Sequence, residues 1–566
     1  MLEGERSYQR GQENLVPSNN TSSAPENPVA PKAQENPWYI RHFTKLLIGF
    51  GLGGGAVAIL LPWMLWLLCG MSSGSSDQLR LHLLYITGGI IAVLTLLQTN
   101  WKNQGDRLKI DADIKKNEQD SEKNERDHIR QVHAERRSRY TKAVEQLADE
   151  KATVRLGGIY TLVGLVDEWL ADGSLEQDEQ QKEGQVIINN LCSYIRSPFL
   201  IAAKLEGYEA RKELNTFEEL ETVFLPEEGS PRFQSLRKRF IDSNEYKEPE
   251  DITAGYAELR EEQDVRRAIF VEMSKRSSIV TQVSQDKFSI IPGAWSDFDF
   301  DFSRAPIFYP LNDLTIEKAN FSSGSFYGET SFFNTIFAQN ADFSGATFVQ
   351  NANFIGSIFI QNANFQEAFF AKKATFIEAT FAQNANFREA TFIQNATFWD
   401  TTFTQNANFR EATFIQNADF GWATFTEATF TGASFIQNAG FGRTTFTQKA
   451  TFIGASFIQT ANFSEALFKN NSPEFVDTYE VSDMASRARF ATPHKNRGRH
   501  KFTVRKDSKP IKLGTTTLLS KPFIIPIGTV LFDSGSWDEE KQDYTRVSEP
   551  AKPLDESKEA EENKPG

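Results

Sequence analysis

The residue types that most often carry chemistry are sparse and scattered in this chain. Its six histidines form no cluster, and His128 and His133 stand five residues apart, whereas a helix that binds a metal ion through two histidines spaces them four apart. Neither a phosphate-binding loop nor a His-Glu metal motif occurs in the sequence. We therefore predict that the protein is not an enzyme and that it uses no metal ion or cofactor.

The cysteines and the repeated carboxylates support the same prediction. Cys69 and Cys192 lie far apart in sequence, so neither a disulfide nor a shared metal ion is expected, which fits a reducing compartment. Glutamates recur two residues after a phenylalanine, at Glu367, Glu378, Glu389 and Glu411. We expect these positions to point outward, where a solvated face explains them better than paired acid and base groups.

Residues 321–468 form a phenylalanine repeat, and this repeat must position the surface residues that could bind a partner. They contain 28 phenylalanines that follow one another at steps of five and six residues in near-strict alternation, so the true period is eleven residues. An alanine precedes 22 of the 28 by two residues. We predict that the core of the repeat includes Phe343, Phe348, Phe354, Phe359, Phe365, Phe376, Phe381, Phe387, Phe392, Phe398, Phe403, Phe409, Phe414 and Phe420.

An eleven-residue period could indicate a supercoiled helix, but the composition opposes it. On a helix, the alternating steps would place the two sets of phenylalanines roughly 140° apart, without a continuous apolar stripe. The intervening residues are Asn, Thr, Gly and Ser, which form helices poorly, around an aromatic residue that favours strands. Alanine and phenylalanine two residues apart face the same side of a strand, so the pattern predicts a β-solenoid.

The unit of a small residue, a polar residue, a phenylalanine and two further polar residues resembles the pentapeptide-repeat family. This resemblance implies a right-handed, four-sided β-helix with four units per turn over roughly residues 300–475. Four units take 22 residues here, so two corners of each turn should hold an extra residue, in Gln-Asn pairs such as Gln383 and Asn384. Asparagine tolerates left-handed corner geometry. Seven turns of about 4.8 Å predict a rod roughly 34 Å long.

One irregularity in the repeat predicts a local change in the solenoid. The step from Phe425 to Phe430 has five residues where six are due, so one corner loses its extra residue there, and a kink or an offset of one face should result. Residues 295–310 are expected to cap the first turn, because an uncovered β end invites aggregation. The solenoid with its N-terminal cap is assigned to residues 288–475.

Two apolar stretches predict a transmembrane hairpin within residues 38–101. Residues 46–68 carry no charge and would span roughly 35 Å as a helix, and residues 81–97 form the second stretch. Basic residues flank both outer sides, which by the positive-inside tendency places both chain ends in the cytoplasm. The glycines of the first stretch lie at hydrocarbon depth with no preceding strand, so we assign Gly49 and Gly53 to close helix packing rather than to phosphate binding.

The segments around the hairpin are assigned by composition. Residues 1–37 are rich in Asn, Pro, Ser and Glu and are predicted to be disordered. Residues 102–139 interleave opposite charges and are predicted to form a solvated helical stalk. Residues 140–287 are predicted to form an α-helical module, whose sequence VRLGGIYTL resembles a module that bacterial pentapeptide-repeat membrane proteins place after their transmembrane hairpin. A ligand site at Arg155 is a hypothesis that Arg155→Ala would test.

Residues 476–566 are predicted to be a largely disordered tail with a basic and then an acidic part. Ten lysines and arginines lie within residues 487–512. A solvated tail is the simpler interpretation of this segment, and contact with anionic lipids of the inner leaflet is the functional alternative. Nucleic acid is not expected as a partner, because few aromatic residues are interleaved with the basic ones.

Together these features predict a mixed membrane α plus β protein with a transmembrane helical hairpin, a cytoplasmic α-helical region and a right-handed quadrilateral β-helix. We predict a non-enzymatic scaffold or protein-interaction module in a bacterial inner membrane, which presents its rigid solenoid to an unidentified protein partner. Oligomerisation of the chain with itself is left open. The faces of the rod are too repetitive for the sequence to single out a binding site.

Two other functions are compatible with a repeat of this kind. A mimic of DNA that binds topoisomerases would need a strongly acidic rod, whereas residues 315–470 contain 11 acidic and 8 basic residues, a net charge of −3. A ladder of threonines could bind ice, but the preference of threonine for strands explains the ladder without further function. The threonines of this ladder are Thr380, Thr391, Thr402, Thr413 and Thr424.

Overall fold

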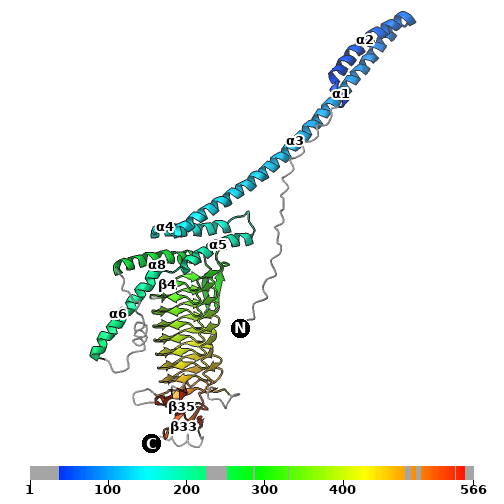
Figure 1. Cartoon of the computed structure of the whole chain (residues 1–566). Coiled ribbons are helices and arrows are strands. Elements are labelled where there is room, and N and C mark those ends of the chain that lie inside the picture. Colours follow the sequence, from blue (N-terminus) through cyan, green and yellow to red (C-terminus); the bar gives the residue numbers. More distant parts are fainter. Residues whose placement is uncertain are drawn as a thin grey trace, which may run out of the picture. The chain divides into compact units, whose positions relative to one another are not determined.

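A computed structural model describes residues 37–224, 251–284, 287–328, 330–477, 486–492, 499–538, 540–541 and 543–554. The chain divides into two compact units, Met1–Ile129 and Arg130–Gly566 (Figure 1). Nearly all of the segment predicted to be disordered at the N-terminus, residues 1–36, lies outside the described residues.

The first unit contains two helices that are long and apolar enough to cross a membrane. The short α1 (Trp38–Arg41) leads into α2 (Phe43–Cys69), and α3 (Ser73–Leu147) follows after Gly70, whose φ of 69° suits glycine. The predicted stalk is not a separate helix, because α3 continues without a break from the apolar stretch through residues 102–139. No proline interrupts this stretch.

Among the glycines of α2, the one that packs closely against α3 is Gly54 and not Gly49 or Gly53. A Cβ atom at Gly54 would lie 2.4 Å from the side chain of Thr87, so only glycine fits there. Nothing lies within 4 Å of the same position at Gly49 or Gly53, so their assignment to close packing does not hold within the hairpin. Successive residues are about 100° apart around a helix, so these glycines point in different directions. Their spacing alone does not tell which of them faces the other helix.

The second unit begins with a helical module. It contains α4 (Ala152–Leu170), α5 (Gln177–Arg196), α6 (Leu200–Phe224) and α8 (Ile252–Ser274), followed by an antiparallel hairpin of β1 (Ile279–Ser284) and β2 (Lys287–Ile291). The end of α3 packs closely on α4, where a Cβ at Gly158 would lie 2.8 Å from the carbonyl oxygen of Ala143. A buried apolar face of α5 packs against α4, which explains the amphipathic pattern of these helices.

The repeats form a β-solenoid of about eight turns (Figure 1). Each turn contributes short strands to four columns, and in the regular turns a strand pairs in parallel with the one 22 residues later, as Ala341 does with Ala363. One more turn is present than the seven predicted. Residues 300–307, expected to lie within the cap of residues 295–310, already pair into the columns as β3 and β4, and β5 follows at residues 315–316.

Four columns of strands follow one another along each turn. The first contains β3 (Phe300–Asp301), β6 (Ala319–Asn320), β10 (Ala341–Asp342), β14 (Ala363–Asn364), β18 (Ala385–Asn386), the second halves of β21 (Thr402–Asn408) and β24 (Thr424–Thr429), and β28 (Ala450–Thr451). The second contains β4 (Pro306–Ile307), β7 (Ser325–Phe326), β11 (Thr347–Phe348), β15 (Phe369–Phe370), β19 (Thr391–Phe392), β22 (Thr413–Phe414), β25 (Ser434–Phe435), β29 (Ser456–Phe457), β32 (Arg489–Ala491) and β35 (Val530–Phe532). The third contains β8 (Thr330–Ser331), β12 (Ala352–Asn353), β16 (Ala374–Thr375), β20 (Ala396–Thr397), β23 (Ala418–Asp419), β26 (Ala439–Gly440) and β30 (Ala461–Asn462). The fourth contains β5 (Thr315–Ile316), β9 (Ile336–Phe337), β13 (Ile358–Phe359), β17 (Thr380–Phe381), the first halves of β21 and β24, β27 (Thr445–Phe446) and β31 (Leu467–Phe468).

The core of the solenoid is a continuous stack of aromatic rings. All fourteen phenylalanines assigned to it are at most 1% exposed. Rings within a column stack almost parallel, as Phe365 and Phe387 do with centroids 4.8 Å apart, and rings of different columns meet edge to face, as Phe376 and Phe387 do at 5.5 Å. Both arrangements are favourable for aromatic pairs, each contributing about 0.5–1.5 kcal/mol beyond the burial of apolar area.

Hydroxyl residues replace the small alanine at several positions before the fourth column without leaving a buried polar group unpaired. The hydroxyl of Thr401 donates a hydrogen bond of 2.7 Å to the carbonyl oxygen of Phe376, and that of Ser357 donates one of 2.8 Å to Phe332. Thr335 and Thr444 donate in the same way to Leu311 and Phe420. A buried hydroxyl is tolerated here because the stacked backbone always offers it a carbonyl.

The predicted offset occurs where the step between phenylalanines shortens. β21 and β24 pair with a shift of register between Phe403 and Asn406. The stack of rings continues through this turn, because Phe403 and Phe425 remain 4.7 Å apart with their planes at 4°. The missing corner residue therefore changes one corner and leaves the core uninterrupted.

The two ends of the solenoid differ from the prediction. At the N-terminal end, α8 covers the first turn with Phe270, whose ring lies 4.7 Å from that of Phe302. At the C-terminal end, the predicted disordered tail instead adds to the solenoid, because β32 and β35 extend the second column and Phe490 stacks on Phe457 at 5.0 Å. The same C-terminal segment also contains β33 (Leu513–Leu518), β34 (Lys521–Pro526), the short helix η2 (Ser534–Ser536), β36 (Trp537–Asp538), β37 (Asp543–Tyr544) and β38 (Lys552–Pro553). The sequence did not predict this extension, because the regular spacing of phenylalanines ends at residue 468.

Candidate functional site

Within the described residues, no group of three or more His, Cys, Asp or Glu side chains could hold a metal ion. Cys192 is buried, and burial raises the pKa of its thiol to about 12, so it would not act as a thiolate. Residues 70–74 have the sequence G-x-S-x-G, which resembles the nucleophile motif of hydrolases. It connects two helices, whereas the nucleophile elbow of a hydrolase requires a strand before the turn, so Ser72 is not placed as a nucleophile.

The repeated carboxylates lie at corners of the solenoid. Glu367, Glu378, Glu389 and Glu411 have φ between 57° and 60°. Most residues with positive φ stand two positions after a phenylalanine, at the two corners of each turn that have no extra residue. The Gln-Asn pairs were expected to take the left-handed conformation, but they lie at the other two corners. The side chains project from the corners toward solvent, where Arg388 and Arg410 pair with neighbouring glutamates.

One corner of the solenoid carries apolar side chains where the equivalent corner carries mostly polar ones. It lies between the third and fourth columns, and the residue directly after the third-column phenylalanine is apolar in four successive turns. The fifth turn has Gly421 at this position and a tryptophan after it. We call these five residues the apolar edge: Phe333, Ile355, Ile377, Trp399 and Trp422.

Backbone hydrogen bonds hold the apolar edge in a straight line. The amide of Asn334 donates to the carbonyl oxygen of Ile355 at 3.0 Å, and the amide of Glu378 donates to that of Trp399 at 3.1 Å, so the residues lie one turn apart. Four such steps of about 4.8 Å make the edge roughly 19 Å long. Phe333, Trp399 and Trp422 are 39%, 38% and 50% exposed.

Neighbouring residues support the two tryptophans in place. A Cβ at Gly421 would lie 3.3 Å from the ring of Trp399, so this glycine leaves room for the indole. The guanidinium of Arg443 lies 5.0 Å from the centre of the Trp422 ring and donates a hydrogen bond of 2.6 Å to Glu465. The edge is therefore ordered in the absence of a partner, which lowers the entropic cost of binding one.

The corner between the first and second columns is a natural control for the apolar edge. At the same place after the phenylalanine it carries seven polar residues and one apolar residue, in order Ser303, Ser322, Ser344, Gln366, Arg388, Arg410, Thr431 and Ile453. The backbone geometry is the same at both corners, so folding does not require apolar residues at either. The signal in the sequence is that large apolar residues, two of them aromatic, directly follow the third-column phenylalanines over four turns. Aliphatic residues likewise follow the second-column phenylalanines, at Val349, Ile393, Ile415, Ile436 and Ile458.

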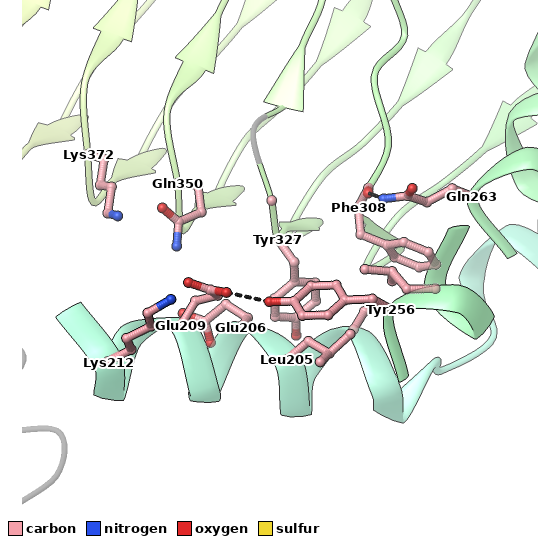
Figure 2. A pocket seen from close by; sticks show the side chains of 13 residues that line it. Leu205, Glu206, Glu209, Lys212, Tyr256, Gln263, Phe308, Tyr327, Gln350 and Lys372 are labelled. Carbon is pink, nitrogen blue, oxygen red and sulfur yellow. Dashed lines mark hydrogen bonds between the residues drawn. The ribbon is translucent and has the colours of Figure 1, made fainter. Parts of the chain in front are cut away.

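A groove of about 500 Å³ lies between α6, α8 and the first turns of the solenoid (Figure 2). One part of its lining is apolar or aromatic and the other is charged. The residues that line it are Ala202, Leu205, Glu206, Glu209, Lys212, Tyr256, Leu259, Gln263, Phe308, Tyr327, Gly328, Gln350 and Lys372. Its volume falls in the range typical of sites for small ligands.

Hydrogen bonds tie the walls of the groove together. The amide of Gln263 on α8 donates a bond of 2.7 Å to the carbonyl oxygen of Phe308, and the hydroxyl of Tyr256 donates to the carboxylate of Glu209 on α6. Burial together with this carboxylate raises the pKa of Tyr256 to about 12, so the phenol stays protonated at neutral pH.

Arg155 takes part in an internal network and also lines a cavity of about 270 Å³. Its guanidinium donates to the backbone carbonyl oxygens of Asp149 and Glu150 and to the carboxylate of Glu262 at 3.1 Å. Glu262 also accepts a hydrogen bond of 2.7 Å from the buried Arg266. These contacts join α4 to α8, and a ligand at Arg155 stays a hypothesis.

The basic residues of segment 487–512 that the structure describes are partly built into the fold. Arg487 donates to the carbonyl oxygen of Gly528 at 2.7 Å, and Arg489 pairs with Asp543. Contact of this segment with anionic lipids stays a prediction.

A family model described as Pentapeptide repeats (9 copies) matches residues 354–402 and 398–445. Neither a curated protein nor a solved structure matched the chain. The family match covers the central turns of the solenoid, so this β-solenoid is built from pentapeptide repeats, and such a solenoid is a module of the protein-interaction type.

Proposed function

We propose that this protein is a membrane-anchored, non-enzymatic scaffold that presents its pentapeptide-repeat solenoid to a protein partner in the cytoplasm. The observation that carries this proposal is the apolar edge, five apolar residues aligned across successive turns, of which Phe333, Trp399 and Trp422 are large exposed aromatic side chains. Aromatic residues are enriched at protein interfaces, and tryptophan is frequent among the residues that dominate binding energy. Folding alone does not account for the edge, because the equivalent corner carries polar residues at most of the same positions.

The helical hairpin supports the membrane part of the proposal. α2 and α3 are each long and apolar enough to span a bilayer, and an even number of spans leaves both ends of the chain on the same side. The basic flanks favour the cytoplasmic side of a bacterial inner membrane. The four strand columns support a four-sided cross-section, and the resemblance of the repeats supplies its right-handed sense.

The proposal is tested by site-specific crosslinking in native membranes. A photoreactive phenylalanine analogue is placed in the full chain at position 399 or 422, and in matched chains at position 388 or 410 on the corner between the first and second columns. We expect one discrete crosslinked protein from positions 399 and 422 and none from 388 and 410. Equal capture from both corners, or none from either, would contradict a partner on the apolar edge.

A double variant then measures the contribution of the edge to binding. Trp399→Ser with Trp422→Ser should weaken capture of the crosslinked protein at least tenfold, because two exposed indoles are lost while the buried core stays intact. The matched variant, Arg388→Ser with Arg410→Ser, should retain capture. Unchanged capture by the tryptophan variant would place the partner elsewhere on the chain.

A further inference from the structure

The basic residues that follow the repeats belong to a further, partial turn of the solenoid. Residues 501–509 run parallel to the last regular turn through backbone hydrogen bonds. The amide of Phe463 donates to the carbonyl oxygen of Lys501 at 2.7 Å. The amide of Lys509 donates in the same way to Phe468, also at 2.7 Å. The backbone therefore holds these basic side chains on a folded surface.

This partial turn exposes a large excess of positive charge. Residues 499–512 contain six basic residues and one acidic residue, Asp507, which pairs with Arg505 at 2.7 Å. The other five cations are exposed, and none of them forms an ion pair with a described residue. Lys469 is also exposed and lies one turn from Lys509 at the same corner. We call these six cations the basic end of the solenoid: Lys469, Arg499, Lys501, Lys506, Lys509 and Lys512.

Neighbouring carboxylates do not neutralise the basic end. Residues 469–554 contain 15 basic and 11 acidic residues, a net charge of +4 with histidine neutral. Several of these acidic residues already pair with cations outside the basic end: Glu474 with Lys449, Asp507 with Arg505, Asp533 with Arg546, Asp538 with Lys541, and Asp543 with Arg489. The C-terminal part of the solenoid therefore keeps a positive charge that an anionic group can stabilise.

The chain continues into a segment of opposite charge. Residues 555–566 lie outside the described residues and contain five acidic and two basic residues, a net charge of −3. The strand β38 pairs antiparallel with β33, so Pro553 lies opposite Gly514. Because antiparallel partners run in opposite directions, this register leads the chain from Pro553 toward Lys512. Twelve residues span at most about 40 Å, roughly eight times the spacing between neighbouring turns.

From this register and the complementary charges, we propose that residues 555–566 bind the basic end of their own chain. The carboxylates of the segment contact Lys509 and Lys512 first, because the register directs the chain toward them. A short tether gives the segment an effective concentration in the millimolar range, so an anionic partner from outside must compete with it. The contact thus controls access to the basic end. It does not depend on the membrane anchor or on the apolar edge.

Carbodiimide crosslinking tests this contact, because the reagent joins a carboxylate to a lysine only where the two groups touch. The full chain is used in phosphatidylcholine nanodiscs, prepared from an equal mixture of isotopically light and heavy chains. We expect links from residues 555–562 to Lys509 and Lys512 within one isotope, and none to the exposed lysines of α3 at positions 115 and 116. The pair of Lys449 and Glu474, 2.9 Å apart, is the internal positive control.

Three outcomes of this crosslinking would overturn the proposal. The first is equal linking of the acidic segment to the lysines of α3, which would show a segment without a fixed site. The second is linking between light and heavy chains, which would assign the basic end to a second copy. The third is the absence of links from the segment in a sample that shows the control pair.

A charge variant tests whether the segment controls access to the basic end. It replaces the five carboxylates of the segment: Asp555→Asn, Glu556→Gln, Glu559→Gln, Glu561→Gln and Glu562→Gln. Its affinity for inorganic polyphosphate, measured by isothermal titration calorimetry, should rise at least tenfold because the competing carboxylates are lost. Adding Lys509→Gln and Lys512→Gln to this variant should cancel the gain.

The matched control removes five carboxylates from exposed positions of α3: Asp111→Asn, Asp113→Asn, Glu118→Gln, Asp120→Asn and Glu125→Gln. It should leave the affinity for polyphosphate unchanged, because exposed charges more than about 8 Å apart are largely screened at about 0.15 M salt. An equal gain in this control would show an effect of net charge alone and overturn the proposal. No gain in the segment variant would overturn it as well.

Discussion

Each phenylalanine of the repeat gains its stability from neighbours one turn away as well as from burial. The ring of Phe387 stacks on Phe365 and Phe409, both at 4.8 Å, and meets Phe376 and Phe398 edge to face at 5.5 Å. A single side chain therefore contributes to three turns. Loss of one ring leaves a cavity that a rigid stack cannot close by small shifts.

Phe387→Ala should lower the free energy of unfolding by about 3–5 kcal/mol, the usual cost of removing a buried aromatic ring. Phe369→Ala is the control, because Phe369 belongs to the same solenoid but is 39% exposed, and it should cost much less. Denaturant unfolding of the full chain, followed by circular dichroism of the strands, measures both. Equal losses would show that the stacked core does not carry the stability assigned to it.

Corner positions with the same left-handed backbone conformation hold different types of side chain. Positions with positive φ hold Glu389, Asp400, Trp422 and Arg443 as well as glycine, although a left-handed conformation disfavours side chains by about 1–2 kcal/mol. The parallel backbone bonds of the adjacent turns hold these residues in place. Because the fold determines the backbone at each corner, the side chains there are available for surface functions such as the apolar edge.

At the scale of elements, a partly buried histidine joins the C-terminal strands β32 and β35 to the last regular turn of the solenoid. His500 accepts a hydrogen bond from the amide of Ala461 through Nδ1 at 3.1 Å and donates through Nε2 to the carbonyl oxygen of Ala491 at 2.9 Å, so the ring is neutral. Burial lowers the pKa of His500 below its usual value, although the bond to Ala491 acts in the opposite sense. The histidine thus links the last regular turn to the added strands.

A lower pH should reduce the stability of the C-terminal strands that His500 joins to the solenoid. Below the ordinary histidine pKa of about 6.5, the unfolded segment binds a proton that the folded segment does not bind. The folded state therefore loses stability as the pH falls from about 6.5 toward the lower pKa of the folded state. We expect the hydrogen-exchange protection factors of residues 486–492 to decrease between pH 7.5 and pH 5.5. His500→Gln should flatten this dependence, and His128→Gln, on the exposed part of α3, should not; constant protection in the original chain would contradict the prediction.

The helices of the second unit act as a cap on the solenoid. Gly184 on α5 admits the ring of Phe298, to which a Cβ would come within 2.5 Å, and Phe270 of α8 covers the first turn. Such a cover removes an exposed β end that could pair with another chain. It also creates the wall of the groove, so the same helices that protect the solenoid provide a second surface for binding.

For the whole molecule, the hairpin makes a prediction about topology. The loop between α2 and α3 should lie on the side of the membrane opposite to both chain ends. Cys69, at the end of α2, is exposed and should react with a membrane-impermeant maleimide from the outer side of right-side-out membrane vesicles. A cysteine introduced by Asn103→Cys should react only after the membrane is permeabilised, and the reverse pattern would invert the proposed orientation.

The sequence alone determined the solenoid, its core phenylalanines and the place of its offset, because a period of eleven residues with alanine two positions earlier leaves one way to bury the rings. It also indicated the apolar helices, since length and absence of charge are sufficient for that. The tertiary structure decided which glycine packs in the hairpin, how the C-terminal residues extend the second column, and where the groove lies. These features depend on contacts between segments distant in sequence, as between Ser456 and Arg489, which no local pattern encodes.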